Sequence, residues 1–167
     1  MVGIIDYGMG NLRSVQKACE YLGHEVIITS DPSKLLSCSH IILPGVGAFA
    51  KAIKQIKRLG LDKTIKTAID QNIPLLGICL GMQLLFESST EGGTHAGLGI
   101  INSKITRFSS DVNVPHMGWN SITPTENSTL FKGLTGDIYV YFVHSYIAAE
   151  INSSWTAATS QYGAEFT

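Results

Sequence analysis

The sequence predicts an α/β fold whose first half is a doubly wound, mostly parallel sheet and whose second half adds antiparallel strands. Up to residue 86, short apolar runs alternate with segments of helical period, which is the pattern of successive βαβ units. After residue 98, apolar runs alternate with turn residues, and the helical period largely disappears. Right-handed crossovers between the early strands then give one doubly wound sheet.

The chain opens with an apolar strand over Val2–Asp6 and a glycine-rich turn. A helix follows, with Asn11 as its N-cap and Gly23 at its end. Its apolar face is expected to carry Leu12, Val15, Ala18, Cys19 and Leu22. The next expected elements are a strand over Glu25–Thr29, a short helix opening at Asp31, a strand over His40–Leu43, and helices over Ala48–Lys57 and Leu61–Asp70.

Within Pro74–Phe86 the spacing of apolar residues changes from that of a strand to that of a helix, and a cysteine lies where it changes. Before it, Leu75, Leu76 and Ile78 form a run typical of a buried parallel strand. After it, Leu80, Leu84 and Leu85 recur at helical spacing. Cys79 is flanked by Gly77 and Gly81, which is the strand–turn–helix pattern of a nucleophile elbow with sulfur in place of the serine oxygen. We expect this elbow near the switch point of the sheet.

Cys79 is therefore a candidate nucleophile. At a helix N-terminus, the dipole favours the thiolate, which is the reactive form of the side chain. A lone cysteine is more often a packed core residue, and Cys19 is interpreted in that way. For Cys79 the two glycines and the change of period favour catalysis over packing.

The loop Pro44–Gly47 follows a predicted strand and contains two glycines, Gly45 and Gly47. Open α/β sheets bind ligands at the carboxyl ends of their strands. Backbone N–H groups with little side chain around them can approach a developing oxyanion. We predict an oxyanion loop here, although the same residues would also suit a simple turn.

The second half is expected to be mostly strands and turns. Ser88–Gly97 is predicted to be a loop, Pro115–Gly118 a turn and Leu130–Gly133 a short helical turn or bend. Strands are predicted over Ile100–Phe108, Trp119–Ile122 and Asp137–Val143, with a hairpin of Trp155–Ser160 and Ala164–Thr167 around Tyr162-Gly163.

Composition excludes several classes of protein. Apolar residues make up 44% and charged residues 15% of the 167 residues, which excludes a disordered chain. The net charge of −1, without a basic cluster, does not suggest binding to nucleic acid or to an anionic membrane. Three cysteines without a Cys-x-x-Cys pair favour reduced thiols and a cytoplasmic protein over a disulfide framework or a zinc site.

Five stretches carry a resemblance to a known family: Asp6–Val15, Pro44–Phe49, Gly77–Gln83, Pro115–Asn120 and Tyr141–Tyr146. Gly77–Gln83 resembles the nucleophile motif of class I glutamine amidotransferases. The other four stretches resemble, in order, the glutaminase subunits of imidazole glycerol phosphate synthase. The resemblance implies a flavodoxin-like fold and a single amidotransferase domain over 1–167.

The resemblance also implies an activity: hydrolysis of glutamine to glutamate and ammonia through a Cys79 thioester, with no metal or organic cofactor. The residues that it assigns to the oxyanion and to glutamine are Gly45, Gly47, Leu80, Gln83, His144, Ser145 and Tyr146. Ammonia would pass to a (βα)₈-barrel cyclase subunit, for imidazole glycerol phosphate synthesis in histidine biosynthesis. Asn11, Met117 and Trp119 are expected to line the contact with that partner.

A cysteine nucleophile normally needs a general base, and the sequence identifies the residue for this role less directly than it identifies Cys79. Of the five histidines, His144 directly follows an apolar strand, so the residues alone nominate it, although a paired structural histidine is the better interpretation. In the family the base and its orienting carboxylate come from a His-Pro-Glu-type motif, which this sequence does not contain. We therefore expect the chain as given to be incomplete at its C-terminus and inactive as a glutaminase when it ends at Thr167.

Other functions stay open at this point. They are an amidotransferase subunit of another pathway (purine or pyridoxal phosphate synthesis), a cysteine hydrolase of the DJ-1-like group, and a non-catalytic regulatory subunit. The stretch Pro115–Asn120 argues against the first, and the Leu-Gly-Met-Gln continuation after Cys79 argues against the second.

Overall fold

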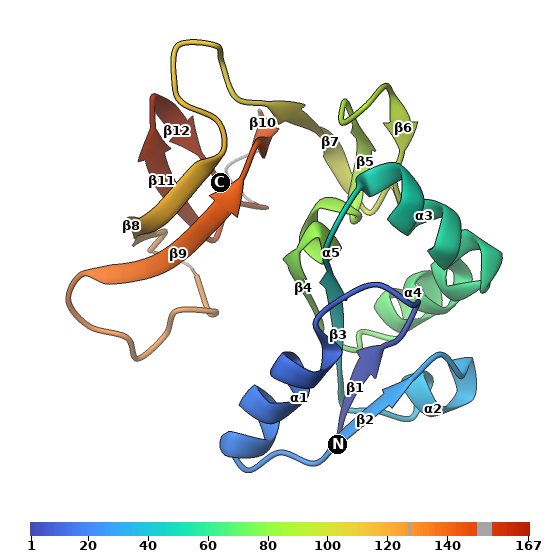
Figure 1. The fold of residues 1–167 in the computed structure, drawn as a ribbon. Coiled ribbons are helices and arrows are strands. Elements are labelled where there is room, and N and C mark those ends of the chain that lie inside the picture. Colours follow the sequence, from blue (N-terminus) through green and yellow to red (C-terminus); the bar gives the residue numbers. More distant parts are fainter. Residues whose placement is uncertain (127, 150–154) are drawn as a thin grey trace. The chain divides into compact units, whose positions relative to one another are not determined.

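A computed structural model of the protein describes residues 1–126, 128–149 and 155–167, which form two compact units (Figure 1). The first unit is Met1–Asn102 and the second is Ser103–Thr167. None of the helices in the described part of the chain is both long and apolar enough to cross a membrane.

The first unit alternates strands and helices as predicted. Its elements are β1 (Val2–Ile5), α1 (Leu12–Tyr21), β2 (Val26–Thr29), α2 (Pro32–Leu36), β3 (His40–Gly45), α3 (Phe49–Arg58), α4 (Leu61–Asp70), β4 (Leu75–Cys79), α5 (Leu80–Gln83), β5 (Phe86–Ser89) and β6 (His95–Ala96). Asn11 and Asp31 cap α1 and α2 through their side chains, which accept hydrogen bonds from the N–H groups of Ser14 and Ser33.

The first four strands form a parallel sheet in the order β2-β1-β3-β4. Helix α1 covers one face, and α2, α3 and α4 cover the other, so the sheet is doubly wound (Figure 1). The chain reverses direction across the sheet between β1 and β3, which makes this the switch point. Cys79 ends β4, an outer strand, and so lies one strand away from the switch point where we expected it.

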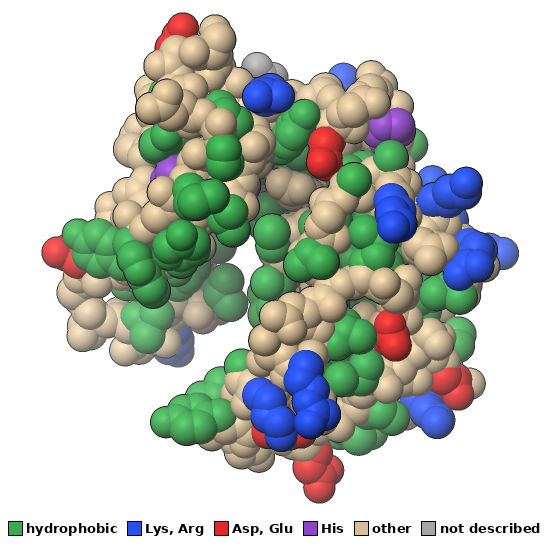
Figure 2. Space-filling model, viewed as in Figure 1, with side chains coloured by type: hydrophobic (Ala, Val, Ile, Leu, Met, Phe, Trp, Pro, Cys, Tyr) green, Lys and Arg blue, Asp and Glu red, His purple; other side chains and the backbone are tan. Residues whose placement is uncertain are grey.

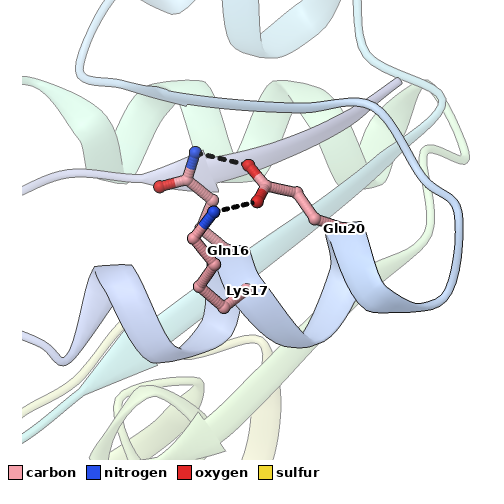
Figure 3. A network of polar contacts seen from close by, with 3 residues as sticks. All are labelled: Gln16, Lys17 and Glu20. Atoms are coloured by element: carbon pink, nitrogen blue, oxygen red, sulfur yellow. Dashed lines mark hydrogen bonds and ion pairs between the residues drawn. The ribbon is translucent and has the colours of Figure 1, made fainter.

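Helix α1 packs on the sheet through fewer residues than predicted. Leu12, Val15 and Cys19 lie against Val2, Ile4 and Ile42, whereas Ala18 is exposed and Leu22, which follows the last turn, is 70% exposed. On its solvent side, Glu20 accepts hydrogen bonds from Gln16 Nε2 at 2.8 Å and Lys17 Nζ at 2.6 Å (Figure 3).

Strand β4 was predicted to be buried, but Leu76 and Ile78 are 43% and 37% exposed. In register, Leu76 lies beside Ile42 and therefore faces the side of the sheet that α1 covers. That helix packs over β1 and β2, which leaves the outer strand uncovered on this face.

The chain after Cys79 differs from the prediction in two places. The helix α5 ends at Gln83 rather than continuing through Leu85, and the predicted loop Ser88–Gly97 instead contains an antiparallel pair of short strands. Ser88 pairs with Ala96 and Ser89 with His95. These strands read Phe-Glu-Ser-Ser and His-Ala, which are too short to show an alternating pattern, so periodicity could not indicate them.

The second unit is built of antiparallel strands. Strand β7 (Ile101–Arg107) leads into it, and its own strands are β8 (His116–Pro124), β9 (Ile138–His144), β10 (Tyr146–Ala149), β11 (Ala158–Tyr162) and β12 (Ala164–Phe166). β9, β8, β11 and β12 form one sheet in that order, and β10 pairs with β7. The turn over 130–133 and the hairpin turn at Gly163 agree with the prediction, but the first strand of the hairpin is Ala158–Tyr162 rather than Trp155–Ser160. The predicted turn Pro115–Gly118 is wrong, since β8 begins at His116, and β10 was not predicted.

Two histidines are paired in this unit, His116 buried and His144 half-buried. His116 is 4% exposed and stacks between Phe142 and Tyr162, with ring centroids 4.8 Å and 4.0 Å away. It faces His144 across the β8–β9 ladder, and His116 Nδ1 lies 2.9 Å from His144 Nε2. Phe108 and Phe166 complete the aromatic surroundings.

The hydrogen bonds of this pair assign its tautomers. His144 Nδ1 lies 3.1 Å from the carbonyl oxygen of Tyr146, so it must carry a proton, and its Nε2 then accepts from His116 Nδ1. His116 Nε2 in turn faces Asn120 Nδ2 at 3.4 Å, and this amide also donates to the carbonyl oxygen of Gln161 at 2.9 Å. Every ring nitrogen is satisfied only while both rings are neutral.

Because both rings must stay neutral, we predict that the stability of the protein depends on pH. Burial lowers the pKa of both His116 and His144 below the ordinary value of 6.5. The unfolded chain therefore takes up protons near pH 6.5 while the folded chain does not. The contribution of the His116–His144 pair to the free energy of unfolding is therefore complete above pH 6.5. It is lost as the pH falls from 6.5 towards the lowered pKa values of the folded state.

Chemical denaturation between pH 7.5 and pH 5.5 tests this. The double variant His116→Leu/His144→Leu, which leaves neither partner unpaired, should lose stability less steeply on acidification than the wild type. His24→Gln, at an exposed position, is the control and should keep the wild-type slope. Equal slopes for the wild type and the double variant would contradict the prediction.

Candidate active site

Cys79 occupies a sharp turn between strand and helix. It ends β4, and α5 begins at the next residue. Its backbone has φ +54° and ψ −120°, a combination that non-glycine residues rarely adopt and that typically costs about 1–3 kcal/mol. The side chain is exposed. This is the geometry of a nucleophile elbow, as the Gly-x-Cys-x-Gly pattern predicted.

The two flanking glycines allow the elbow to pack against its neighbours. A Cβ at Gly77 would lie 2.5 Å from Met82 Cα, and a Cβ at Gly81 would overlap the carbonyl oxygen of Leu43. Both contacts are with backbone atoms, which cannot move aside as a flexible side chain would. The elbow therefore requires glycine at both positions.

The loop after β3 begins directly beside Cys79. Gly45 is the register partner of Cys79, and Gly47 has φ +89°, in the region that glycine favours. The side chain of Met9, from the turn after β1, lies beside this loop, 3.3 Å from where a Cβ at Gly47 would be. The structure thus places Gly45 and Leu80 next to Cys79, with Gly47 two residues further along the same loop.

Gln83 is the last residue of α5, four residues after Cys79, and is half-buried. His144, Ser145 and Tyr146 lie in the second unit, at the join between β9 and β10. There the carbonyl oxygen of Ser145 accepts a hydrogen bond from Phe108 N–H, and both ring nitrogens of His144 are engaged. This arrangement matches the interpretation of His144 as a paired structural histidine.

Two residues of the first unit were not predicted from the sequence: Tyr7, close to the elbow, and Glu91, at the helix after the Pro44–Gly47 loop. Tyr7 is 1% exposed, and its pKa is raised to about 12 by burial and, secondarily, by the charge of Cys79. Glu91 Oε2 accepts a hydrogen bond at 3.0 Å from the N–H of Phe49, the first residue of α3, and so caps the helix that follows the Pro44–Gly47 loop. Tyr7 lay within a stretch already singled out, whereas Glu91 lay in one taken as a loop.

The predicted contact residues are all at the surface of their units. Trp119 is 71% and Met117 60% exposed, both on β8, and Asn11 is exposed at the start of α1. Among the described residues, no group of three or more His, Cys, Asp or Glu side chains is arranged to hold a metal ion.

The fold is shared with solved structures. A crystal structure of a glutamine amidotransferase matches the chain with a TM-score of 0.74 at 17% identity, over 97% of this chain and 85% of that one. A glutamine amidotransferase from Thermotoga maritima matches with a TM-score of 0.60 at 16% identity, over 98% of this chain and 72% of that one. At these identities the likeness establishes the fold.

Closer relatives establish the family. The class-I glutamine amidotransferase model matches residues 3–166. The chain is 46% identical to the imidazole glycerol phosphate synthase subunit HisH of Moorella thermoacetica, over 99% of this chain and 79% of the relative. It is 47% identical to subunit HisH of Caldanaerobacter subterraneus subsp. tengcongensis, over 99% of this chain and 81% of the relative. The chain therefore belongs to the class-I glutamine amidotransferases and, among them, to the HisH subunits of imidazole glycerol phosphate synthase.

Proposed function

We propose that the chain is the glutaminase subunit of imidazole glycerol phosphate synthase. It hydrolyses glutamine to glutamate and ammonia, and the ammonia serves a (βα)₈-barrel cyclase subunit in histidine biosynthesis. The observation that carries this proposal is the exposed Cys79 at a strained elbow, in a chain of this family. Cytoplasmic localisation follows from the same proposal.

Cys79 acts as the nucleophile. Its thiolate attacks the carbon of the side-chain carboxamide, which forms a C–S bond and moves an electron pair to the carbonyl oxygen. The backbone N–H groups of Gly47 and Leu80 hold this oxyanion, and each such donor is typically worth about 3 kcal/mol. As the oxyanion collapses, the C–N bond breaks and the departing nitrogen takes a proton from water to leave as ammonia. The hydroxide so formed attacks the thioester carbon, and the C–S bond breaks to give glutamate and the free Cys79 side chain.

The remaining groups position the substrate. Gln83 and the Ser145–Tyr146 backbone hold the amino-acid end of glutamine. His144 contributes by fixing this segment, because it donates to the carbonyl oxygen of Tyr146 and accepts from His116. With both ring nitrogens engaged, His144 is assigned to positioning rather than to proton transfer.

Replacing the nucleophile tests the proposal. In the enzyme assembled with its cyclase subunit, Cys79→Ala should lower glutaminase turnover by at least about 10⁴-fold, because nucleophile and base act as a unit. Synthesis from free ammonia should continue, since the cyclase subunit carries out its own chemistry. Cys19→Ala, on the packed side of α1, is the matched control and should keep both activities. Glutamine hydrolysis that persists in Cys79→Ala would refute the assignment.

The outer face of the β8–β9 ribbon supports the proposed interface. Side chains alternate strictly along both strands, and five apolar ones are 54–71% exposed on the same face: Met117, Trp119, Tyr139, Tyr141 and Val143. Trp119 and Tyr141 are register partners and pack edge to face, with ring centroids 5.8 Å apart. Figure 2 shows hydrophobic side chains gathered over this ribbon. A continuous exposed apolar surface of this kind is typical of a protein–protein contact.

Trp119 is the expected anchor of this contact. Trp119→Ala should weaken binding of the cyclase subunit by about 10- to 100-fold, which is the range of an aromatic hot spot, and should leave the melting temperature unchanged. Titration of the cyclase subunit by calorimetry measures the affinity. Trp155→Ala removes a tryptophan of similar exposure, 60%, outside this face and should bind normally. A Trp119→Ala subunit that melts at a lower temperature would instead identify Trp119 as part of the core.

A further inference from the structure

Glu91 joins two parts of the first unit that are far apart in sequence. It lies in the turn between β5 and β6, and its Oε2 accepts a hydrogen bond at 3.0 Å from the N–H of Phe49, 42 residues earlier. Phe49 is the first residue of α3, and its side chain is fully buried in the main core of the unit. The carboxylate is therefore attached to a point of the backbone that the core holds in place.

Helix α3 has no local cap at its start. Its N-cap residue is Ala48, which has no side chain that can accept a hydrogen bond, and its first turn contains no acidic residue. The first N–H groups of a helix have no partner within the helix, and the positive end of the helix dipole favours a negative charge there. Glu91 supplies both the acceptor and the charge from a distant segment.

The turn that carries Glu91 is itself held in place. The N–H of Glu91 donates to Ser89 Oγ at 3.2 Å, and Ser89 is fully buried at the end of β5. Ser89 pairs with His95 of β6, and β5 follows α5 in the chain. Glu91 therefore reaches the start of α3 from a segment that is continuous with the Cys79 elbow.

The Glu91 bond gives the loop after β3 a second fixed end. At the start of this loop, Gly45 is paired with Cys79 in the β3–β4 ladder. At its end, the first residue of α3 is bound to Glu91. Only residues 46–48 lie between these two points, and they include Gly47, with its φ of +89°. The position of the Gly47 backbone therefore depends on two contacts with the segment that runs from Cys79 to Glu91.

Building on the proposed function, in which the Gly47 N–H holds the oxyanion, we propose that Glu91 is a positioning residue that acts through this loop. Its carboxylate fixes the start of α3, so that the Gly47 N–H is already in place when the oxyanion forms. Such preorganisation makes an oxyanion donor effective, and a displacement of about 1 Å can lower a rate by about 100-fold. Glu91 transfers no proton and touches no reacting atom.

Glu91→Ala in the enzyme assembled with its cyclase subunit tests this inference. The change removes the acceptor, so kcat for glutamine should fall about 10- to 100-fold while KM changes less than about 3-fold. Glu91→Gln keeps an amide oxygen that can accept the bond from Phe49 N–H, and its kcat should stay within about 3-fold of the wild type. Iodoacetamide alkylates Cys79 without forming an oxyanion, so the alkylation rate should be the same in the wild type and both variants.

Asp31→Ala is the matched control for the loss of a helix cap. Asp31 caps α2, which packs against β1 and α4, by accepting a hydrogen bond from Ser33 N–H at 2.9 Å. Both alanine variants should melt a few degrees below the wild type, because each loses one cap. Only Glu91→Ala should lose kcat.

Three results would overturn the proposal. The first is a wild-type kcat in Glu91→Ala, and the second is an equal loss of kcat in Asp31→Ala. The third is a raised KM with unchanged kcat in Glu91→Gln, because the carboxylate would then bind the ammonium group of glutamine instead of holding the loop. Failure of the proposed nucleophile is distinguishable from all three, because Cys79→Ala would then still hydrolyse glutamine.

Discussion

Close backbone packing between β3 and the elbow after β4 is the constraint on which the site depends. The elbow turns at Cys79 with a positive φ, and only glycine at position 81 allows it to lie against the carbonyl oxygen of Leu43. This packing places the sulfur at the carboxyl edge of the sheet, beside Gly45, where the Pro44–Gly47 loop begins. It also brings the elbow over the phenol of Tyr7. One contact therefore positions the proposed nucleophile, Cys79, and the start of the proposed oxyanion loop.

Much of the fold was predictable, because strong local signals agree with the packing. The helix caps at Asn11 and Asp31, the helices over 49–58 and 61–70, and the parallel strands follow directly from periodicity and capping chemistry. The predictions that were wrong concern segments whose structure is decided by pairing with residues distant in the sequence. The strands around Ser88 and His95 have no alternating pattern, and β8 starts at His116 because its residues pair with β9. Exposure of Leu76 on an outer strand likewise depends on where α1 lies.

The sharp turn at Cys79 and the loop at Gly45 and Gly47 could be predicted, because they depend on short local patterns, Gly-x-Cys-x-Gly and two glycines after a strand. Their catalytic roles stay predictions. Tyr7, Glu91 and the His116–His144 pair depend on contacts between segments distant in sequence: Tyr7 with the elbow, Glu91 with Phe49 N–H, and one histidine with another across two strands. No spacing rule indicates such contacts. The histidine pair also shows why a histidine after an apolar strand is a weak indicator of a base, since its ring nitrogens already have partners.

Covalent labelling by a glutamine analogue is the most direct test of Cys79 as the nucleophile. A diazoketone such as 6-diazo-5-oxo-L-norleucine carries the amino-acid end of glutamine and alkylates a thiolate placed at its side-chain carbonyl. Peptide mass spectrometry of the assembled enzyme should find a single adduct on Cys79, formed in step with the loss of glutaminase activity and slowed by glutamine. Cys19 and the buried Cys38 should remain unmodified. An adduct elsewhere, or full activity after complete labelling of Cys79, would contradict the account.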